Sequence, residues 1–346
     1  MDDDFGAAMR RSLERVRGGD PMAATAAIQA ALRGGTGPSA RPRRPLGATV
    51  SGLASKLRRA GQPRPAPAMP VGARFERHVH RGPHGERAYR LYVPATDAPL
   101  RGVVVMLHGC TQDACDFAAG TGMNAQAERH GLLVVWPEQA RSANAQGCWN
   151  WFRPGDQAPG AGEPALLAGL VAEAARHAGA THLPVHVAGL SAGAAMAVIL
   201  GAAYPDRFRS VGAHSGLALG SARDVPSAFA AMQGQGARAP RPAAPVPTII
   251  FQGAADPTVH SSNAEAIARG AAGPGAQVET TERGRSNGRR YARTVATAAD
   301  GASVSEVWMV EGLGHAWSGG DARGSHTDAA GPDASAEMVR FFLRER

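Results

Sequence analysis

The pentapeptide Gly189-Leu190-Ser191-Ala192-Gly193 places a serine where it can act as a nucleophile. It follows the apolar run 185–188 and opens an alanine-rich stretch that predicts a helix. Small residues two positions before and after a serine let the backbone make the tight strand-to-helix turn that exposes the hydroxyl. The turn also puts the Ala192 N–H at a helix N-terminus, where it stabilises negative charge. The pattern predicts acyl transfer by Ser191, with a simple junction of small residues as the alternative.

A serine nucleophile needs a general base and an acid that orients the base. In this kind of turn the three follow in the order serine, acid, histidine. Asp256 and His315 each follow an apolar run that predicts a strand, so both lie where such a sheet displays its functional groups. We predict Asp256 as the acid and His315 as the base, with His260 and His326 as competing bases.

A second N–H donor for an oxyanion is expected in the loop His108-Gly109-Cys110-Thr111-Gln112, which follows a continuous apolar run. Glycine lets the backbone approach a substrate, and a His-Gly pair at this place is typical of such hydrolases. We predict the Cys110 N–H as the donor, with the Thr111 N–H as the alternative. Because a serine with its own base is present, Cys110 is not expected to be a nucleophile.

The elements that must position these residues alternate along the chain. Continuous apolar runs predict buried strands, and stretches with helical periodicity separate them. Strands alternating with helices predict a mostly parallel central sheet with helices on both faces. The predicted elements are a hairpin at 74–79 and 87–93, strands at 102–107, 132–136, 185–188, 211–213, 248–251 and 305–310, and helices that include 121–130, 164–178, 192–203, 262–270 and 334–344.

The first 70 residues differ from the rest in composition and charge. Residues 1–33 predict a short helical arm, and residues 34–70, rich in Pro, Gly and Arg, predict a linker. Residues 1–70 hold 12 of the 37 basic side chains but only 5 of the 29 acidic ones, so residues 71–346 are nearly neutral. We expect the arm to be solvated, with contact to an anionic surface as the alternative. No nucleic-acid partner is expected, and 71–346 is the predicted catalytic domain.

Composition excludes several classes of protein. With 346 residues, 44% of them hydrophobic and 19% charged, the chain is too apolar to be disordered. No apolar run approaches the roughly 18–20 residues of a membrane span. Three cysteines exclude a cysteine-dense zinc or disulfide scaffold, and no histidine pair has the context of a metal ligand, so no metal and no cofactor are predicted.

Six motifs occur in an order that is specific to one family. They are His108–Gln112, Trp136–Gln139, Cys148–Phe152, Gly189–Gly193, Asp256–His260 and Gly312–Gly320. From about residue 75 to 343, the chain resembles the polyhydroxybutyrate depolymerase-type esterase family of α/β-hydrolases. The resemblance implies the α/β-hydrolase fold, a triad of Ser191, Asp256 and His315, and an oxyanion hole formed by the Cys110 and Ala192 N–H groups.

The resemblance also bears on the cysteines and the aromatic residues. In the strand order of this fold the loops carrying Cys110 and Cys148 lie side by side, which favours a disulfide; three free thiols remain the alternative. Trp149 and Trp151 share one loop at the rim, and Trp317 follows the predicted base by two residues. We predict that these three tryptophans bind the substrate, with core packing as the alternative.

The implied function is a serine carboxylesterase that hydrolyses short-chain or hydroxyalkanoate esters or oligomers through an acyl-enzyme. Feruloyl or acetylxylan esters are the alternative substrates, and a non-catalytic binding module and a serine peptidase are weaker alternatives. Residues 1–30 lack the apolar segment of a secretory signal, which favours a cytoplasmic location; an extracellular one, common in the family, is the alternative. No added polymer-binding domain is recognisable, which favours soluble oligomers over crystalline polymer.

Overall fold

The computed structural model describes residues 69–344 except 97, 238–241, 274–275 and 299–300. The predicted arm 1–33 lies outside the described residues, and so does the predicted linker 34–70 except for its last two residues. The contact of the arm with an anionic surface therefore stays a prediction. None of the helices within the described ranges is long and apolar enough to cross a membrane.

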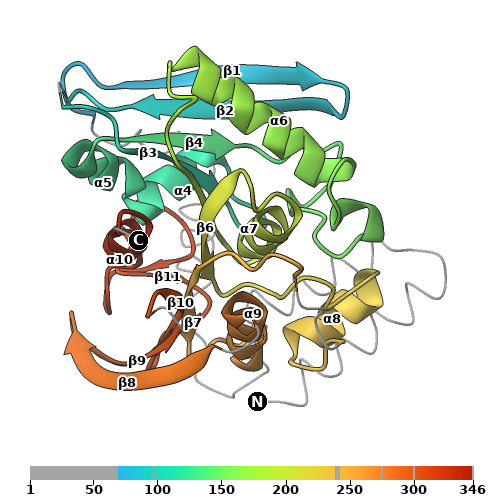
Figure 1. Cartoon of the computed structure of the whole chain (residues 1–346), viewed down its shortest axis with the longest axis vertical. Helices are drawn as coiled ribbons and strands as arrows, with labels where there is room; N and C mark the ends of the chain where they lie inside the picture. The colour runs from blue at the N-terminus through green and yellow to red at the C-terminus, as the bar shows by residue number, and fades with distance from the viewer. Residues whose placement is uncertain (1–68, 97, 238–241, 274–275, 299–300, 345–346) are drawn as a thin grey trace, which may run out of the picture. The chain divides into compact units, whose positions relative to one another are not determined.

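One large sheet runs through the described part of the chain (Figure 1). Its six central strands are parallel, and an antiparallel hairpin flanks them on each side. In spatial order the strands are β1 (Arg74–Gly82), β2 (Gly85–Val93), β4 (Leu132–Pro137), β3 (Gly102–Leu107), β5 (Val185–Leu190), β6 (Phe208–His214), β7 (Thr248–Gly253), β10 (Ser303–Val310), β9 (Arg289–Thr297) and β8 (Gln277–Ser286). This arrangement confirms the mostly parallel sheet that the alternating elements predicted.

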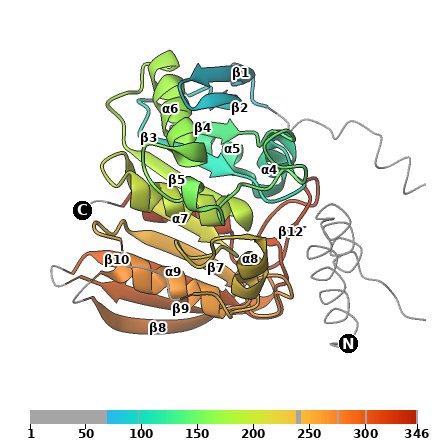
Figure 2. The ribbon, with the colours of Figure 1, turned by 90° about the vertical axis from the view of Figure 1, so that its right-hand side faces the viewer.

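Helices cover both faces of the sheet, as predicted. Helices α6, α7 and α9 pack on one face, and α4, α5 and α10 pack on the other (Figures 1 and 2). The helices are α4 (Ala114–Thr121), α5 (Met123–His130), α6 (Gly162–His177), α7 (Ala192–Ala203), α8 (Val225–Met232), α9 (Ser262–Ala272) and α10 (Ala334–Phe342), with a 3₁₀ turn at Pro154–Asp156. Gly122, with φ of 65°, ends α4 before α5 begins, and the apolar patterning had predicted only the second of this pair.

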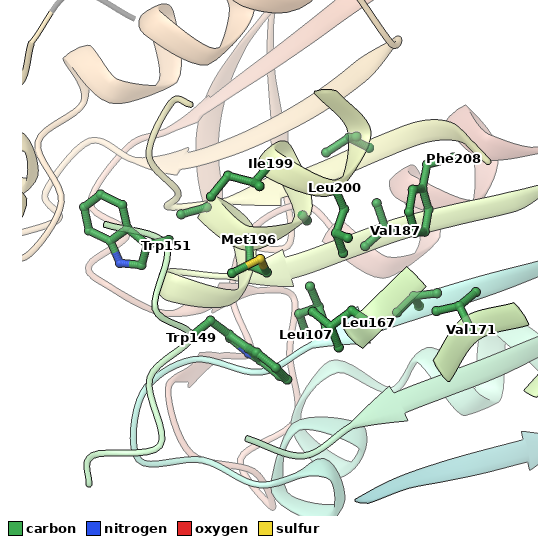
Figure 3. Close-up of a cluster of buried hydrophobic side chains, with 14 of the residues drawn as sticks. Leu107, Trp149, Trp151, Leu167, Val171, Val187, Met196, Ile199, Leu200 and Phe208 are labelled. Atoms are coloured by element: carbon green, nitrogen blue, oxygen red, sulfur yellow. The ribbon is translucent and has the colours of Figure 1, made fainter. Parts of the chain in front are cut away.

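The hydrophobic core lies between the parallel strands and the two helix layers. All six side chains of β3 and all six of β4 are buried, as expected for strands covered on both faces. Figure 3 shows one layer of this core, where Leu107 and Val187 from the sheet lie beneath Met196 and Leu200 of α7. Because α7 begins at the predicted nucleophile, this packing fixes the position of the turn that carries it.

The hairpin formed by β8 and β9 was not predicted. Its strands consist largely of threonine, arginine and glutamate, and they contain no apolar run. It joins the sheet through β9, which pairs antiparallel with β10, and Tyr291 of β9 packs against Trp308 at 4.8 Å between ring centroids. A hairpin with so little apolar surface depends on a neighbouring strand for its stability.

Glu306 of β10 joins this hairpin to α10. The carboxylate is buried and accepts hydrogen bonds from Arg293 Nε (3.0 Å) and from Arg340 of α10 (2.5 Å). Burial by itself raises the pKa of Glu306. The hydrogen bonds and charges of the two arginines outweigh burial and hold this pKa below its usual value. The ionised carboxylate therefore stabilises the folded state above the pKa of an unfolded glutamate, about 4.3, and loses that contribution as the pH falls through its folded pKa.

We expect Glu306→Gln to lower the free energy of unfolding at pH 7 by about 2 kcal/mol, because two arginines lose their shared charge partner while both keep some access to water. Glu265→Gln is the matched control. Glu265 pairs with Arg269 at 3.7 Å on the exposed surface of α9, so its loss costs at most a few tenths of a kcal/mol. Urea unfolding at pH 7 and pH 3.5 measures both variants. A difference between wild type and Glu306→Gln that does not shrink at the lower pH would contradict this account.

Candidate active site

Ser191 lies in the turn between β5 and α7, in a backbone conformation that side-chain-bearing residues rarely adopt. Its φ is 57° and its ψ is −119°. The Ser191 N–H donates a hydrogen bond to the carbonyl oxygen of His214, the last residue of β6, at 2.9 Å. The neighbouring strand thus holds the strained residue in place, as a strand-to-helix nucleophile turn requires.

The two glycines of the motif are required by close packing. A Cβ atom at Gly193 would lie 2.0 Å from the carbonyl oxygen of Leu107, the last residue of β3. A Cβ at Gly189 would lie 2.4 Å from the carbonyl carbon of Gly193. No side chain fits at either distance, so the turn can press against the end of β3 only with glycine at both positions.

Asp256 and His315 form a hydrogen-bonded pair. The Nδ1 atom of His315 lies 2.8 Å from Oδ2 of Asp256, whose Oδ1 accepts the backbone N–H groups of Thr258 (2.8 Å) and Val259 (2.9 Å). Burial by itself raises the pKa of Asp256, but the hydrogen bond and charge of His315 and the two backbone N–H groups hold this pKa below its usual value. An ionised carboxylate in this position orients the imidazole with Nε2 free to accept a proton.

The two competing histidines do not pair with Asp256. The exposed ring of His260 lies 2.9 Å from the Ser262 hydroxyl, within its own turn. His326 precedes the short strand β12 (Thr327–Asp328), and its carbonyl oxygen accepts a backbone N–H from β11 (Trp317–Ser318). Within the described residues, His315 is therefore the histidine that Asp256 orients.

The topology brings the three predicted catalytic residues to one edge of the sheet. Ser191 follows β5, Asp256 follows β7 and His315 follows β10, and these strands belong to the parallel part of the sheet. Their carboxyl ends therefore meet at the same edge, where ligands bind in open α/β sheets. The loops after β7 and β10 are also joined directly, because the Ala254 N–H donates to the Val310 carbonyl at 2.9 Å.

Two backbone N–H groups at this edge are candidates for an oxyanion hole. Ala192 is the first residue of α7, so its N–H has no partner within the helix. The Cys110 N–H likewise has no hydrogen-bond partner in the part of the chain that the structure describes. The alternative donor is already engaged, because the Thr111 N–H donates to the Gln146 carbonyl at 2.9 Å. The geometry therefore favours Cys110 over Thr111.

A disulfide links the predicted oxyanion loop to the loop after β4. Cys110 and Cys148 are bonded, with their Cα atoms 4.3 Å apart, and Cys115 is a free thiol. Of the two alternatives that the sequence left open, the structure has the disulfide. The bond fastens the backbone on one side of Ser191 to the segment that carries Trp149 and Trp151.

His108 anchors the same loop from below. Its Nδ1–H donates to the Gly109 carbonyl at 2.8 Å, and its Nε2 accepts the Gln139 N–H at 3.1 Å. Its own carbonyl accepts the indole N–H of Trp149 at 3.1 Å. Burial lowers the pKa of His108, so the ring stays neutral and Nε2 keeps its role as an acceptor.

A buried polar network extends from His108 toward α6. Glu163, in the first turn of α6, accepts hydrogen bonds from the Gln139 side chain and from the Asn150 backbone N–H (2.7 Å). Arg87 of β2 lies 3.8 Å from the same carboxylate. Because every member is buried, the network defines one conformation for the loop after β4.

Two of the three tryptophans predicted to bind substrate lie wholly within the core, and for Trp151 substrate binding stays a prediction. Trp149 and Trp317 have no exposed surface, and Trp151 is 6% exposed. Trp317 packs edge-to-face on Phe117 and donates its indole N–H to the Ser335 hydroxyl at 3.2 Å. Figure 3 shows Trp149 pointing into the cluster beneath α7. The prediction is thus wrong for Trp149 and Trp317, which pack against the backbone that carries the site and have no surface to offer a substrate.

His214 was not predicted as a site residue, although it contacts two parts of the site. Its carbonyl holds the Ser191 N–H, and its Nε2 accepts the backbone N–H of Ser318 at 3.0 Å, three residues beyond His315. The ring stacks on Trp317 with centroids 5.1 Å apart. Burial, and next the positive charge of nearby His315, lower the pKa of His214 to about 3, so the ring is neutral at physiological pH. The available signal was a polar residue directly after the short apolar run 211–213.

The arrangement combines a half-buried strained serine, an oriented histidine and two backbone donors. These are the groups that acyl transfer through a covalent intermediate requires. No group of three or more His, Cys, Asp and Glu side chains within the described ranges is placed to hold a metal ion.

Comparison with known proteins agrees with this chemistry. A family model described as "Esterase PHB depolymerase" matches residues 87–272, more than half of the chain. Poly(3-hydroxyalkanoate) depolymerase C of Paucimonas lemoignei is 38% identical over 136 residues, which is 39% of this chain and 32% of that protein. Feruloyl esterase B of Neurospora crassa is 30% identical over 128 residues, 37% of this chain and 43% of that protein. The chain spans between about a third and a half of the length of these relatives.

A solved structure shows the same fold. The acetyl xylan esterase from Aspergillus awamori superimposes with a TM-score of 0.58 at 22% identity, covering 70% of this chain and 94% of that one. At this identity the likeness concerns the fold alone.

We expect His214→Phe to slow ester hydrolysis by about tenfold or more while the stacking on Trp317 is kept. The substitution removes the acceptor for the buried Ser318 N–H, so the segment after His315 loses its anchor, and small misplacements of catalytic groups are costly. His214→Gln restores an oxygen near the position of Nε2 and should recover part of the rate. The measurement is kcat, with the concentration of active enzyme taken from labelling of Ser191 by a fluorophosphonate. The melting temperature of each variant shows whether a lower rate comes from a loss of stability. Equal rates in His214→Phe and wild type would contradict the anchoring role.

Proposed function

The chain belongs to the PHB depolymerase family of esterases, and on this basis we propose that it is a serine carboxylesterase that cleaves hydroxyalkanoate esters or oligomers through an acyl-enzyme. The single observation that carries the chemistry is the His315–Asp256 hydrogen bond at the sheet edge where the strained Ser191 turn lies. The substrate class rests on the similarity to a poly(3-hydroxyalkanoate) depolymerase.

In the acylation step, the Ser191 oxygen attacks the ester carbonyl carbon while His315 Nε2 takes the hydroxyl proton. Asp256 holds the Nδ1–H tautomer and stabilises the imidazolium that forms. The negative charge that develops on the carbonyl oxygen is stabilised by the Ala192 and Cys110 N–H groups. The tetrahedral intermediate collapses when the bond to the alcohol oxygen breaks and His315 gives its proton to the leaving alcohol.

Deacylation repeats these steps with water. His315 removes a proton from water, the hydroxide attacks the acyl carbon, and the Ser191 oxygen leaves with the proton returned by His315. The free carboxylic acid is released and the enzyme returns to its starting state. Each residue thus acts twice, and replacing Ser191 or His315 alone should cost nearly as much as replacing both.

A second substrate class has support of its own. Similarity to a feruloyl esterase favours esters of plant cell-wall polysaccharides. The same triad serves both classes, because the chemistry at the carbonyl carbon is identical. The groups on either side of the ester bond decide between them.

We expect Ser191→Ala to lower hydrolysis of p-nitrophenyl butyrate by about ten-thousand-fold or more, because the nucleophile is lost while the binding groups stay. Reaction with a fluorophosphonate probe should label wild type at Ser191 and leave the variant unlabelled. Mass spectrometry of the labelled peptide identifies the site. A wild-type protein that hydrolyses no ester and takes up no probe would refute a catalytic role and favour a binding module.

The choice of base is tested by His315→Ala beside His260→Ala and His326→Ala. We expect a loss close to that of Ser191→Ala for His315→Ala, and near wild-type rates for the other two, because Asp256 orients His315. The kcat values of the three variants on the same ester give the comparison. If His260→Ala or His326→Ala were equally damaging, the assignment of the base would be wrong.

The substrate class is tested by comparing hydroxybutyrate oligomers, methyl ferulate and acetylated xylan at equal ester concentration. We expect the highest kcat/KM on the hydroxybutyrate oligomers. A preference for feruloyl or acetylxylan esters would leave the mechanism standing and assign the enzyme to the second class.

A further inference from the structure

The hairpin of β8 and β9 carries five arginines, which the strand register sorts onto two faces. Arg285 lies directly opposite Arg290, and Arg283, two residues before Arg285, shares their face. Arg289 and Arg293 alternate with these positions and lie on the other face. Figure 1 shows the hairpin at the end of the sheet next to β10, far from the β1–β2 hairpin.

The two arginines on the α10 side are neutralised by carboxylates. Arg289 contacts Asp328 at 2.5 Å, and Arg293 contacts Glu306 at 3.0 Å and Glu282 at 3.5 Å. These pairs join the hairpin to the loops and helix behind it, so their charges have a structural role.

The other three form what we call the arginine face: Arg283, Arg285 and Arg290. All three are exposed, and none has an ion pair in the part of the chain that the structure describes. Of these three side chains, Arg285 donates a hydrogen bond to the Gly288 carbonyl at 3.3 Å, within its own turn. Like charges directly opposite each other across two strands destabilise a hairpin, so folding gains nothing from this cluster.

The hairpin turn lies at the same sheet edge as the candidate active site. Tyr291 of β9 is paired with Val310 at the carboxyl end of β10. The Glu311 N–H donates to the Arg290 carbonyl at 2.9 Å, and His315 follows four residues later in the same loop. In the strand order, β9 is four strands from β5, and a spacing of about 4.8 Å per strand puts Arg290 roughly 19 Å from the end of β5.

The mechanism places the alcohol fragment of the substrate on the side of the site where the arginine face lies. His315 protonates the leaving alcohol, so the alcohol fragment departs on the His315 side of the ester, and the hairpin adjoins β10, the strand that leads into the His315 loop. In a hydroxyalkanoate oligomer every hydroxyl group except that of the first unit is esterified by the carboxyl of the preceding unit. The free carboxylate is therefore always at the far end of the alcohol fragment, and a single ester unit is too short to reach the hairpin.

We propose that the arginine face binds the terminal carboxylate of the alcohol fragment of an oligomeric ester, with a hydroxyalkanoate oligomer as the occupant. The inference rests on the proposed function, since it assumes the same triad and leaving group. Arginine suits this role because its planar group matches a carboxylate with two parallel hydrogen bonds. The face selects for chain length and for a free acid end.

The test compares hydroxybutyrate oligomers that carry a free carboxylate with the same oligomers capped as methyl esters. We expect kcat/KM at low ionic strength to be about tenfold higher for the free acids, because three exposed arginines each contribute weakly. The preference should disappear in high salt, since such charges are screened. p-Nitrophenyl butyrate, which has no carboxylate and cannot reach the hairpin, should show neither effect.

The variant R283Q/R285Q/R290Q should lose the preference for free acids and keep its rate on p-nitrophenyl butyrate. The matched control, R101Q/R129Q/R176Q, removes three exposed arginines that lie near the amino ends of the parallel strands and should keep the preference. The salt dependence of the wild-type protein is a second measurement that does not depend on how the variants fold.

The possible failures are distinguishable. A wild-type protein inactive on every ester would refute the proposed function. An active protein that treats free and capped oligomers alike at low salt would overturn the inference alone. If the variant instead lost activity only on acetylated xylan bearing glucuronate, compared with xylan lacking it, the hydroxyalkanoate occupant would be overturned in favour of uronate carboxylates.

Discussion

The contact between the Ser191 turn and the end of β3 is the constraint on which the rest of the site depends. The turn can form only where Gly193 lies against the Leu107 carbonyl, a separation that excludes any side chain. A positive φ at a serine costs on the order of 1–3 kcal/mol, and contacts with the surrounding sheet must offset that cost. The packed core under α7 and the hydrogen bond from Ser191 to β6 do so. The conformation of Ser191 therefore depends on the packing of the whole sheet around it.

Backbone strain gathers at the same edge. Among the described residues, the non-glycine positions with positive φ are Thr111, Ser191, Ser215, Asn287 and His326. Each lies in a loop at the carboxyl ends of the parallel strands or in the turn of the β8–β9 hairpin beside them. Sparsely populated conformations persist where neighbours over-determine them, and here disulfide, network and sheet contacts all converge. The amino-terminal edge of the sheet has none of these residues in the described ranges.

Two buried imidazoles, His108 and His214, have the same structural role on either side of Ser191. Each accepts a backbone N–H on Nε2, from Gln139 and Ser318 respectively. Burial lowers the pKa of both rings, so each remains an uncharged acceptor. The His108 ring anchors the loop of the predicted oxyanion donor, and the His214 ring anchors the segment after the predicted base. A neutral His214 ring suits the proposed role of His315 as the base, because a second positive charge there would oppose proton uptake by His315.

Local patterns of apolar runs, glycines and spacing predicted the parallel sheet and the strand-to-helix turn at Ser191, and they placed Asp256 and His315 directly after strands of that sheet. The folded chain was needed to show that His315 pairs with Asp256, that the Thr111 N–H is engaged, and that Cys110 bonds to Cys148. The structure also shows that Trp149 and Trp317 lie in the core and that His214 contacts the candidate site. These facts depend on contacts between segments far apart in the chain, and a single sequence carries no record of which of its many possible contacts form.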